Sequence, residues 1–172
     1  MKINAGVEWA AHACALLGAL PPDWTLSAED LAAYHDVPPA YMAKQMQALS
    51  KAGLVRSTRG AAGGYRLARA TTDISLWDVT AAVDGPAPAF RCTEIRQNGP
   101  CGTAAKDCLK PCGIAASFLA AEQAYREHLR GVSIADIMAG IAAAAAARTG
   151  APDKLAKVGQ WIEAHAARPA EA

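Results

Sequence analysis

Residues 52–69 of this 172-residue chain, AGLVRSTRGAAGGYRLAR, carry its clearest structural signal. It holds two short strand candidates, residues 54–57 and 65–68, on either side of a glycine-rich turn over residues 58–64. A strand, a glycine turn and a second strand predict a β-hairpin. Gly53 suits the end of a helix that runs into the hairpin.

Three helices are expected ahead of the hairpin, over residues 3–20, 27–34 and 38–52. Pro21 ends the first, and Ser27 followed three residues later by Asp30 opens the second as an imperfect capping box. Proline suits the first turn of a helix, as at the start of the third. This order predicts a mainly α fold with a small β-hairpin, a winged helix-turn-helix.

Further helices are expected after the hairpin, over residues 75–83, 114–129, 133–148 and 153–166. Residues 86–113 contain four prolines and most of the cysteines, so we expect a loop there.

Composition limits the possible functions. Apolar residues make up 52% of the chain and the net charge is only +1, so a nucleic-acid surface must be a local patch. No stretch reaches the ~20 apolar residues that span a bilayer, and the N-terminus does not resemble a signal peptide. We therefore expect a cytoplasmic protein. We find no nucleophile–base pair, phosphate-binding loop or acid pair, so an enzyme is not expected.

Positive charge is concentrated on the third helix and the hairpin. Residues 41–70 contain six Lys or Arg and no Asp or Glu. In a winged helix these two elements face DNA, where basic side chains neutralise phosphates. The candidate DNA-binding residues are Ala40, Tyr41, Lys44, Gln45, Arg56, Arg59 and Arg66. Gln45 suits adenine, and Arg59 lies at the wing tip. The alternative is a solvated basic face beside an ordinary hairpin.

These residues also carry a family resemblance. The chain resembles the BadM/Rrf-type regulators from its first residues to about Met138, most specifically through residues 52–69. The other matching positions are Leu31-Ala32, Val37, Tyr41-Met42, Lys44-Gln45-Met46, Leu49, Ile74, Asp78-Val79 and Asp84-Gly85. The resemblance implies a winged-helix domain, a cluster loop and a long dimerisation helix over about residues 114–129.

That resemblance divides the chain into four parts. Residues 1–85 are expected to form the DNA-binding domain, residues 86–113 the cysteine-rich cluster loop, residues 114–148 the dimerisation helix and the helix after it, and residues 149–172 a linker with a short helix.

Five cysteines are present. Cys14 on the first helix is expected to be a small core residue. The other four are Cys92, Cys101, Cys108 and Cys112, and in a reducing compartment such a cluster indicates metal or redox chemistry. The IscR-like and NsrR-like members of the family carry three evenly spaced cysteines in this loop. The spacing here departs from that pattern, so their ligand set is not carried over.

The first helix supplies a second set of candidate ligands. Glu8 and His12 are four residues apart and share one helical face. The motifs GVEWAAH, FRCTEIRQNGP and CLKPCGIA most resemble the RsrR-like redox regulators of the family. That resemblance implies a [2Fe–2S] cluster shared across a homodimer, with Glu8 and His12 from one protomer and Cys108 and Cys112 from the other.

Each of these residues also has a simpler interpretation. Glu8 and His12 can be ordinary surface residues, and Cys92 and Cys101 can be spare thiols, alternative ligands or a disulfide pair. Trp9 follows Glu8 directly and is a candidate switch residue that moves with the state of the cluster; otherwise it is a packing residue.

The leading hypothesis is a dimeric repressor of palindromic double-stranded DNA whose affinity follows the redox state of a [2Fe–2S] cluster. A second hypothesis keeps DNA binding and replaces iron with thiol oxidation or zinc. A third is a protein-interaction module with a degenerate winged helix. The operator, the target genes and the signal do not follow from the sequence.

Overall fold

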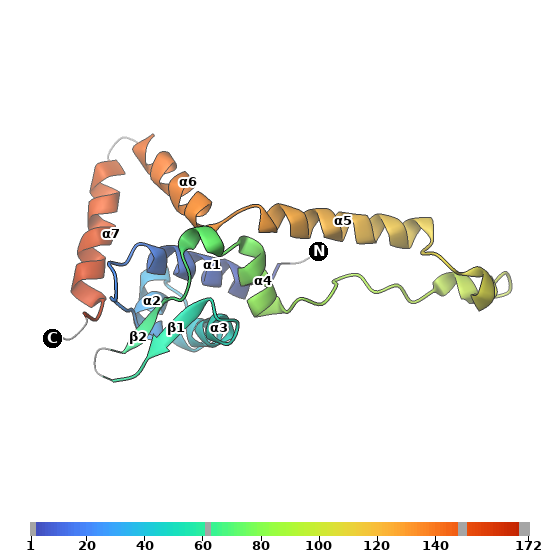
Figure 1. The fold of residues 1–172 in the computed structure, drawn as a ribbon, viewed down its shortest axis with the longest axis horizontal. Helices are drawn as coiled ribbons and strands as arrows, with labels where there is room; N and C mark the ends of the chain where they lie inside the picture. The colour runs from blue at the N-terminus through green and yellow to red at the C-terminus, as the bar shows by residue number, and fades with distance from the viewer. Residues whose placement is uncertain (1–2, 61–62, 148–150, 169–172) are drawn as a thin grey trace.

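The computed structural model describes residues 3–60, 63–147 and 151–168 (Figure 1). The helices and strands are α1 (Ala5–Gly18), α2 (Ala28–His35), α3 (Pro39–Lys51), β1 (Val55–Thr58), β2 (Gly64–Leu67), α4 (Leu76–Asp84), α5 (Gly113–Arg130), α6 (Ile134–Ala146) and α7 (Ala151–His165). Three 3₁₀ turns are η1 (Thr71–Asp73), η2 (Ile95–Gln97) and η3 (Ala105–Asp107). The predicted fold, mainly α with one β-hairpin, is confirmed.

Local sequence sets the ends of the helices in the helix-turn-helix. The side chain of Ser27 accepts a hydrogen bond from the backbone of Asp30 while the Asp30 carboxylate accepts one from the backbone of Ser27, which completes the predicted capping box. Asp36 ends α2 in the left-handed conformation, and Pro39 begins α3. Gly53, at φ +70°, turns the chain from α3 into β1.

The hairpin forms the wing. β1 and β2 are antiparallel, with Arg56 opposite Arg66. Leu26 adds an isolated bridge to Tyr65 on the outer edge of β2. A Cβ atom at Gly64 would lie 2.7 Å from the carbonyl oxygen of Leu26, so this close approach requires glycine. Ala61 and Ala62 of the predicted turn lie outside the described residues.

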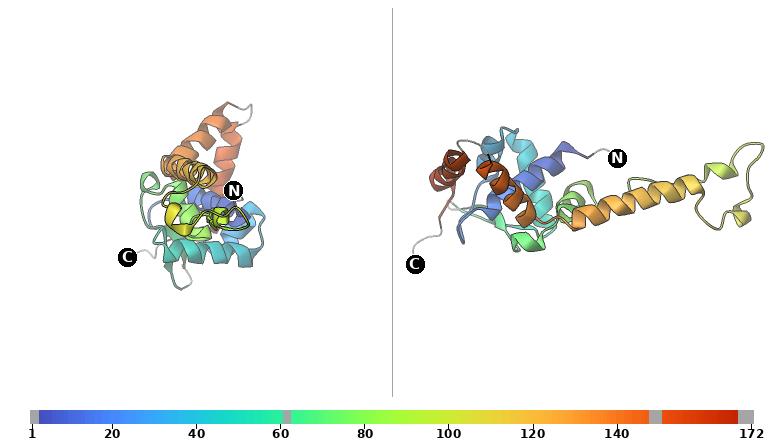
Figure 2. Two further views of the ribbon diagram at one scale, coloured as in Figure 1. Left: turned by 90° about the vertical axis from the view of Figure 1, so that its right-hand side faces the viewer. Right: turned by 90° about the horizontal axis from the view of Figure 1, so that it is seen from above.

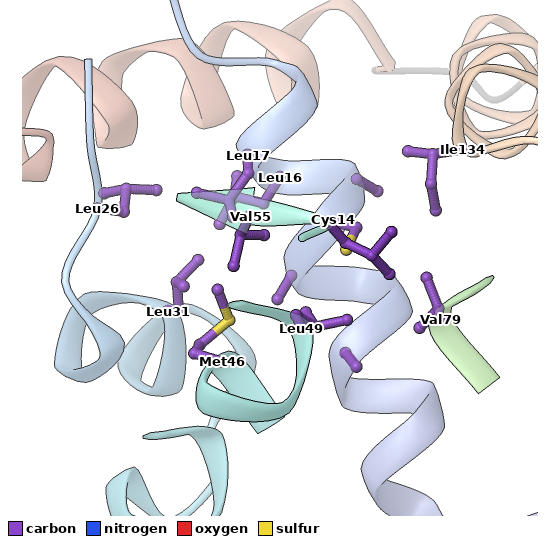
Figure 3. Close-up of a cluster of buried hydrophobic side chains, with 14 of the residues drawn as sticks. Cys14, Leu16, Leu17, Leu26, Leu31, Met46, Leu49, Val55, Val79 and Ile134 are labelled. Atoms are coloured by element: carbon purple, nitrogen blue, oxygen red, sulfur yellow. The ribbon is translucent and has the colours of Figure 1, made fainter. Parts of the chain in front are cut away.

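One hydrophobic core joins α1 to the winged helix (Figure 3). α1 packs against α3, α4 and α6, and the fully buried side chains of this core include Leu31 of α2 and Met46 and Leu49 of α3. Burial of a leucine side chain contributes about 1.5–3 kcal/mol, so this cluster fixes where α3 lies. Cys14 is fully buried in the same core, as expected, and burial raises the pKa of its thiol to about 12.

An arm projects from this compact body. We define the arm as residues 86–112 together with α5. Figures 1 and 2 show α5 leaving the body beside α4, with the preceding chain running outward to a tip that contains η2 and η3. The root of the arm is fixed by Glu122, a buried carboxylate that accepts hydrogen bonds from the backbone of Ala89 (3.1 Å) and Phe90 (3.3 Å). The ring of Phe90 also stacks on that of Phe118, with the ring centres 4.9 Å apart.

The last two helices return to the body. The N–H of Ile134 at the start of α6 donates to the carbonyl of Ile74. Trp161 of α7 lies with its ring 4.7 Å from that of Tyr34, and Ala167 forms an isolated bridge with Thr25. The predicted end of the α6 helix at 148 lies outside the described residues. None of the helices in the described ranges is long and apolar enough to cross a bilayer.

Candidate DNA interface and cysteine arm

One face of α3 is open to solvent. After the exposed Pro39 that begins the helix, its exposed side chains follow the helical period and are Ala40, Tyr41, Lys44, Gln47 and Lys51. Three of the four residues that the sequence predicted for this helix, Ala40, Tyr41 and Lys44, therefore lie on one accessible surface. Gln47 was missed, although its spacing of three from Lys44 places it on the same face.

The structure differs from the sequence prediction at Gln45. It was expected to read a base edge, but its side chain is buried at 6% exposure. A Cβ atom at Gly6 of α1 would lie 2.8 Å from Nε2 of Gln45, so the amide is packed between α1 and α3. This placement does not fit base recognition, because the amide cannot reach a groove without leaving the interior. Gln47, two residues later, is the exposed amide of α3.

The wing presents Arg56 and Arg59 to solvent. Arg66 lies directly across from Arg56, and like charges at such positions repel. Asp23 relieves this repulsion, since its carboxylate accepts a hydrogen bond from Arg66 at 2.8 Å. Arg66 is therefore ion-paired in this structure with its side chain 37% exposed, whereas Arg56 and Arg59 are exposed wing cations.

Trp9 connects the first helix to the recognition helix. Its ring is partly buried and meets that of Tyr41 edge to face, with ring centres 5.9 Å apart. Tyr41 is 57% exposed and begins the open face of α3. Together with the contact between Gly6 and Gln45, this places the first two turns of α1 against α3 at two points.

Glu8 and His12 are both exposed on α1. The ring of His12 lies 5.4 Å from that of His35 on α2. Burial, and secondarily the neighbouring His12, lowers the pKa of His35. The Nε2 atom of His35 is buried with no hydrogen-bond partner among the described residues. The two predicted ligands thus form an accessible pair on the surface of the body.

Cys108 and Cys112 flank the segment of the arm that contacts Arg96, and both are partly buried. The sulfur of Cys112 caps α5 and accepts a hydrogen bond from the backbone N–H of Ala115 at 3.5 Å. Arg96 donates to the backbone carbonyls of Cys108 and Lys110. Its pKa is raised, first by the hydrogen bond to Glu94 and also by the nearby Cys108 and Cys112 sulfurs.

The remaining arm cysteines differ from this pair. Cys92 and Cys101 are exposed and free. The sulfur of Cys92 accepts a hydrogen bond from the backbone N–H of Glu94 at 3.4 Å. No group of three or more His, Cys, Asp or Glu in the described part of the chain lies close enough to hold a metal ion. The described residues of one protomer therefore do not form a four-ligand site by themselves.

The accessible basic face of α3, the wing and the helical core define a winged-helix DNA-binding protein. The chain belongs to the Rrf2 family, described as iron-dependent transcriptional regulators, whose profile matches residues 3–140. The family and the matched relatives are transcriptional regulators, so the chain is not an enzyme.

Relatives and solved structures agree with this assignment. An HTH-type transcriptional regulator of Lactococcus lactis, YffB, is 32% identical over 137 residues, which cover 80% of this chain and 86% of that protein. The Bacillus subtilis regulator YwgB is 39% identical over 85 residues, about half of each chain (49% and 54%). The global cysteine regulator CymR of B. subtilis shares the fold at TM-score 0.64 and 20% identity, covering 81% of this chain and 97% of its own. T. potens IscR does so at TM-score 0.61 and 20% identity, covering 82% and 88%.

Proposed function

We propose that this protein is a homodimeric repressor whose affinity for a palindromic operator is switched by the redox state of a [2Fe–2S] cluster held between its two protomers. Glu8 and His12 of one protomer and Cys108 and Cys112 of the other are the proposed ligands. The proposal takes the DNA-binding role from the family and adds the cofactor, its ligands and its switching role. It assigns residues 1–85 to DNA binding and residues 86–113 to the cluster loop.

One observation carries the proposal. The two ligand pairs sit on different parts of the molecule, because α1 belongs to the body whereas residues 95–112 form the far end of the arm (Figure 1). An arm that leaves its own body can reach a second copy. A twofold dimer repeats the contact, so two equivalent sites follow from one interface.

The chemistry of the four side chains fits the cluster. Thiolates are the usual ligands of iron–sulfur clusters, and histidine replaces cysteine at one iron of Rieske centres. Glu8, His12, Cys108 and Cys112 are all at least partly accessible. The sulfur of Cys112 also lies at the N-terminal end of α5, where the helix dipole favours negative charge. When bound, such a cluster supplies one-electron redox chemistry.

The residues of α1 link the proposed site to DNA. Glu8 and His12 share the first turns of α1 with Gly6 and Trp9, which contact Gln45 and Tyr41 of α3. A small tilt of α1 therefore moves the start of the recognition helix. A coupling of about 1–3 kcal/mol suffices to change operator occupancy. If the DNA affinity of a Trp9→Phe variant still changes normally with the redox state of the cluster, the coupling through Trp9 is refuted.

The DNA face consists of exposed side chains of α3 and the wing. Ala40, Tyr41 and Lys44 are proposed for the major groove, with Gln47 in place of Gln45. Arg56 and Arg59 are proposed for phosphate or minor-groove contacts. In a dimer, two such helices lie about one helical turn of DNA apart, which requires a palindromic site.

A second candidate is a switch by thiol oxidation without iron. Cys92 and Cys101 are exposed thiols on the arm, and one structure with this fold, at TM-score 0.60 and 20% identity, is an oxidised form of Staphylococcus aureus CymR. In that case oxidant treatment of colourless, iron-free protein changes DNA binding.

Anaerobic purification followed by visible spectroscopy and native mass spectrometry tests the proposal. The expected result is a coloured dimer with two irons and two sulfides per site. Loss of the cluster after replacement of Cys108 and Cys112, with retention after replacement of Cys92 and Cys101, supports the ligand set. A colourless dimer, or one that keeps its iron when all four proposed ligands are replaced, refutes it.

A further inference from the structure

Arg96 joins the outgoing and returning segments of the chain at the tip of the arm. Its guanidinium Nη2 donates to the carbonyl of Lys110 at 2.5 Å and to that of Cys108 at 3.4 Å. Its own carbonyl accepts a hydrogen bond from the N–H of Thr103 at 2.9 Å. One residue of the outgoing chain therefore fixes the backbone on which the two half-buried cysteines lie.

Glu94 holds the guanidinium in this orientation. Its carboxylate accepts from Nε of Arg96 at 2.7 Å, so Nη2 is directed to the carbonyls on the other side. Glu94 itself lies in the left-handed region at φ 52°, and its N–H donates to the sulfur of Cys92. The arrangement is a chain of contacts that runs from Cys92 through Glu94 and Arg96 to the segment between Cys108 and Cys112.

We propose that Arg96 is the positioning residue of the cluster site: it sets the spacing of Cys108 and Cys112 and keeps one positive charge beside their sulfurs. The inference rests on the proposed function, because it names a residue that supports the same cysteine pair. Arg96 contacts the backbone carbonyls of Cys108 and Lys110 and not the reacting atoms. Partners that orient ligands in this way tune metal affinity and potential.

The charge of Arg96 predicts the direction of its effect. Reduction adds one negative charge to the site, and a nearby fixed cation stabilises that charge. Removing the cation therefore disfavours the reduced state and lowers the midpoint potential. Removing the hydrogen bonds to the two carbonyls loosens the cysteine segment and lowers the retention of iron.

Two variants separate these effects. Arg96→Gln removes both the positive charge and the planar guanidinium with its fixed N–H donors. Arg96→Lys keeps the charge but loses that donor geometry. Arg91→Gln is the matched control, since Arg91 is an exposed cation on the same arm. The measurements are iron and sulfide per dimer, and the midpoint potential from an anaerobic titration followed by visible absorbance.

For Arg96→Gln we expect about a tenfold lower ratio of reduced to oxidised protein at the wild-type midpoint, which corresponds to ~59 mV for one electron. Arg96→Lys should restore most of the potential but not the retention of iron. Arg91→Gln should match the wild type in both. Equal potentials and equal iron retention in Arg96→Gln and Arg91→Gln overturn the inference.

A cluster-free measurement keeps this inference distinct from the proposed function. An absence of iron in the wild-type protein refutes the cluster, but the positioning role can still be tested by alkylation of the reduced protein with iodoacetamide. The bonds from Arg96 hold the backbone on which these two partly buried thiols lie, so its loss should make them more accessible. Arg96→Gln should speed labelling of Cys108 and Cys112 relative to the exposed Cys101, as followed by peptide mass spectrometry. Unchanged relative rates overturn the inference in either case.

Discussion

Ile114 offers a test of the proposed dimer interface. It lies in the first turn of α5 and is 71% exposed, beside the exposed side chains of Phe118 and Leu119. Ile114 and Phe118 border a shallow apolar groove of about 440 Å³ on α5. A second copy would cover this surface, because contiguous exposed apolar patches commonly mark interfaces. We predict that Ile114→Ala weakens dimerisation without unfolding the body.

The size of the effect follows from the exposed area. Complete burial of an isoleucine is worth about 1.5–3 kcal/mol, and alanine keeps part of that contribution. We expect a loss of about 1–2 kcal/mol for each protomer. A twofold interface contains the residue twice, so the total is about 2–4 kcal/mol. At 1.4 kcal/mol per tenfold change, the dimer Kd rises by about 30- to 700-fold.

Sedimentation equilibrium over a range of protein concentrations measures this change. Ile141→Ala is the matched control, since Ile141 is 48% exposed but lies on α6, outside the arm. Thermal unfolding of both variants checks that the body is intact. A wild-type Kd for Ile114→Ala, or an equal loss for Ile141→Ala, refutes the assignment of the interface to the arm.

Three further predictions concern the body. Lys44→Ala should weaken binding to all DNA sequences about equally and reduce the salt slope by about one per protomer, as measured by fluorescence anisotropy at several salt concentrations. Cys14→Ser should lower the free energy of unfolding in urea by about 1–3 kcal/mol while leaving the iron content unchanged, because it buries a hydroxyl in an apolar core. Hydrogen bonds from Ser133 lower the pKa of Asp136, so its carboxylate stabilises the fold above its unfolded pKa, and this contribution is lost as the pH falls through the lowered folded value. Asp136→Asn should accordingly make the free energy of unfolding depend less on pH in the acid range. A pH dependence identical to that of the wild type contradicts the capping role.

The DNA-binding half of the fold could be predicted because its signals are local. Ser27 with Asp30 defines a helix start, Gly53 a helix end, and residues 52–69 a hairpin. Each depends on neighbours in the sequence, so no knowledge of packing was needed. Placing Gln45 required more, because its burial depends on how closely Gly6 lets α1 approach α3. Counting along the helical period from Lys44 to Gln47 and Lys51 could have corrected this.

Several side-chain interactions that hold the arm and the wing in place were not predicted, because their partners are far apart in the sequence. Glu122 contacts a backbone more than thirty residues away, and nothing near it in the sequence marks a buried carboxylate. Arg66 looked like a wing cation, yet its partner Asp23 is 43 residues earlier. Arg96 lies in the motif FRCTEIRQNGP, which resembles the RsrR-like regulators. Its hydrogen bonds to the carbonyls of Cys108 and Lys110 are seen only in the folded arm.

Mixed dimers distinguish a cluster shared by two protomers from one held within a single protomer. One protomer would carry Glu8→Ala and His12→Ala, its differently tagged partner would carry Cys108→Ala and Cys112→Ala, and iron would be counted in the purified heterodimer by native mass spectrometry. If the ligands come from both protomers, the heterodimer has one intact site and holds one cluster, whereas each variant homodimer holds none. A heterodimer without iron, beside a wild-type dimer that contains it, contradicts a shared site.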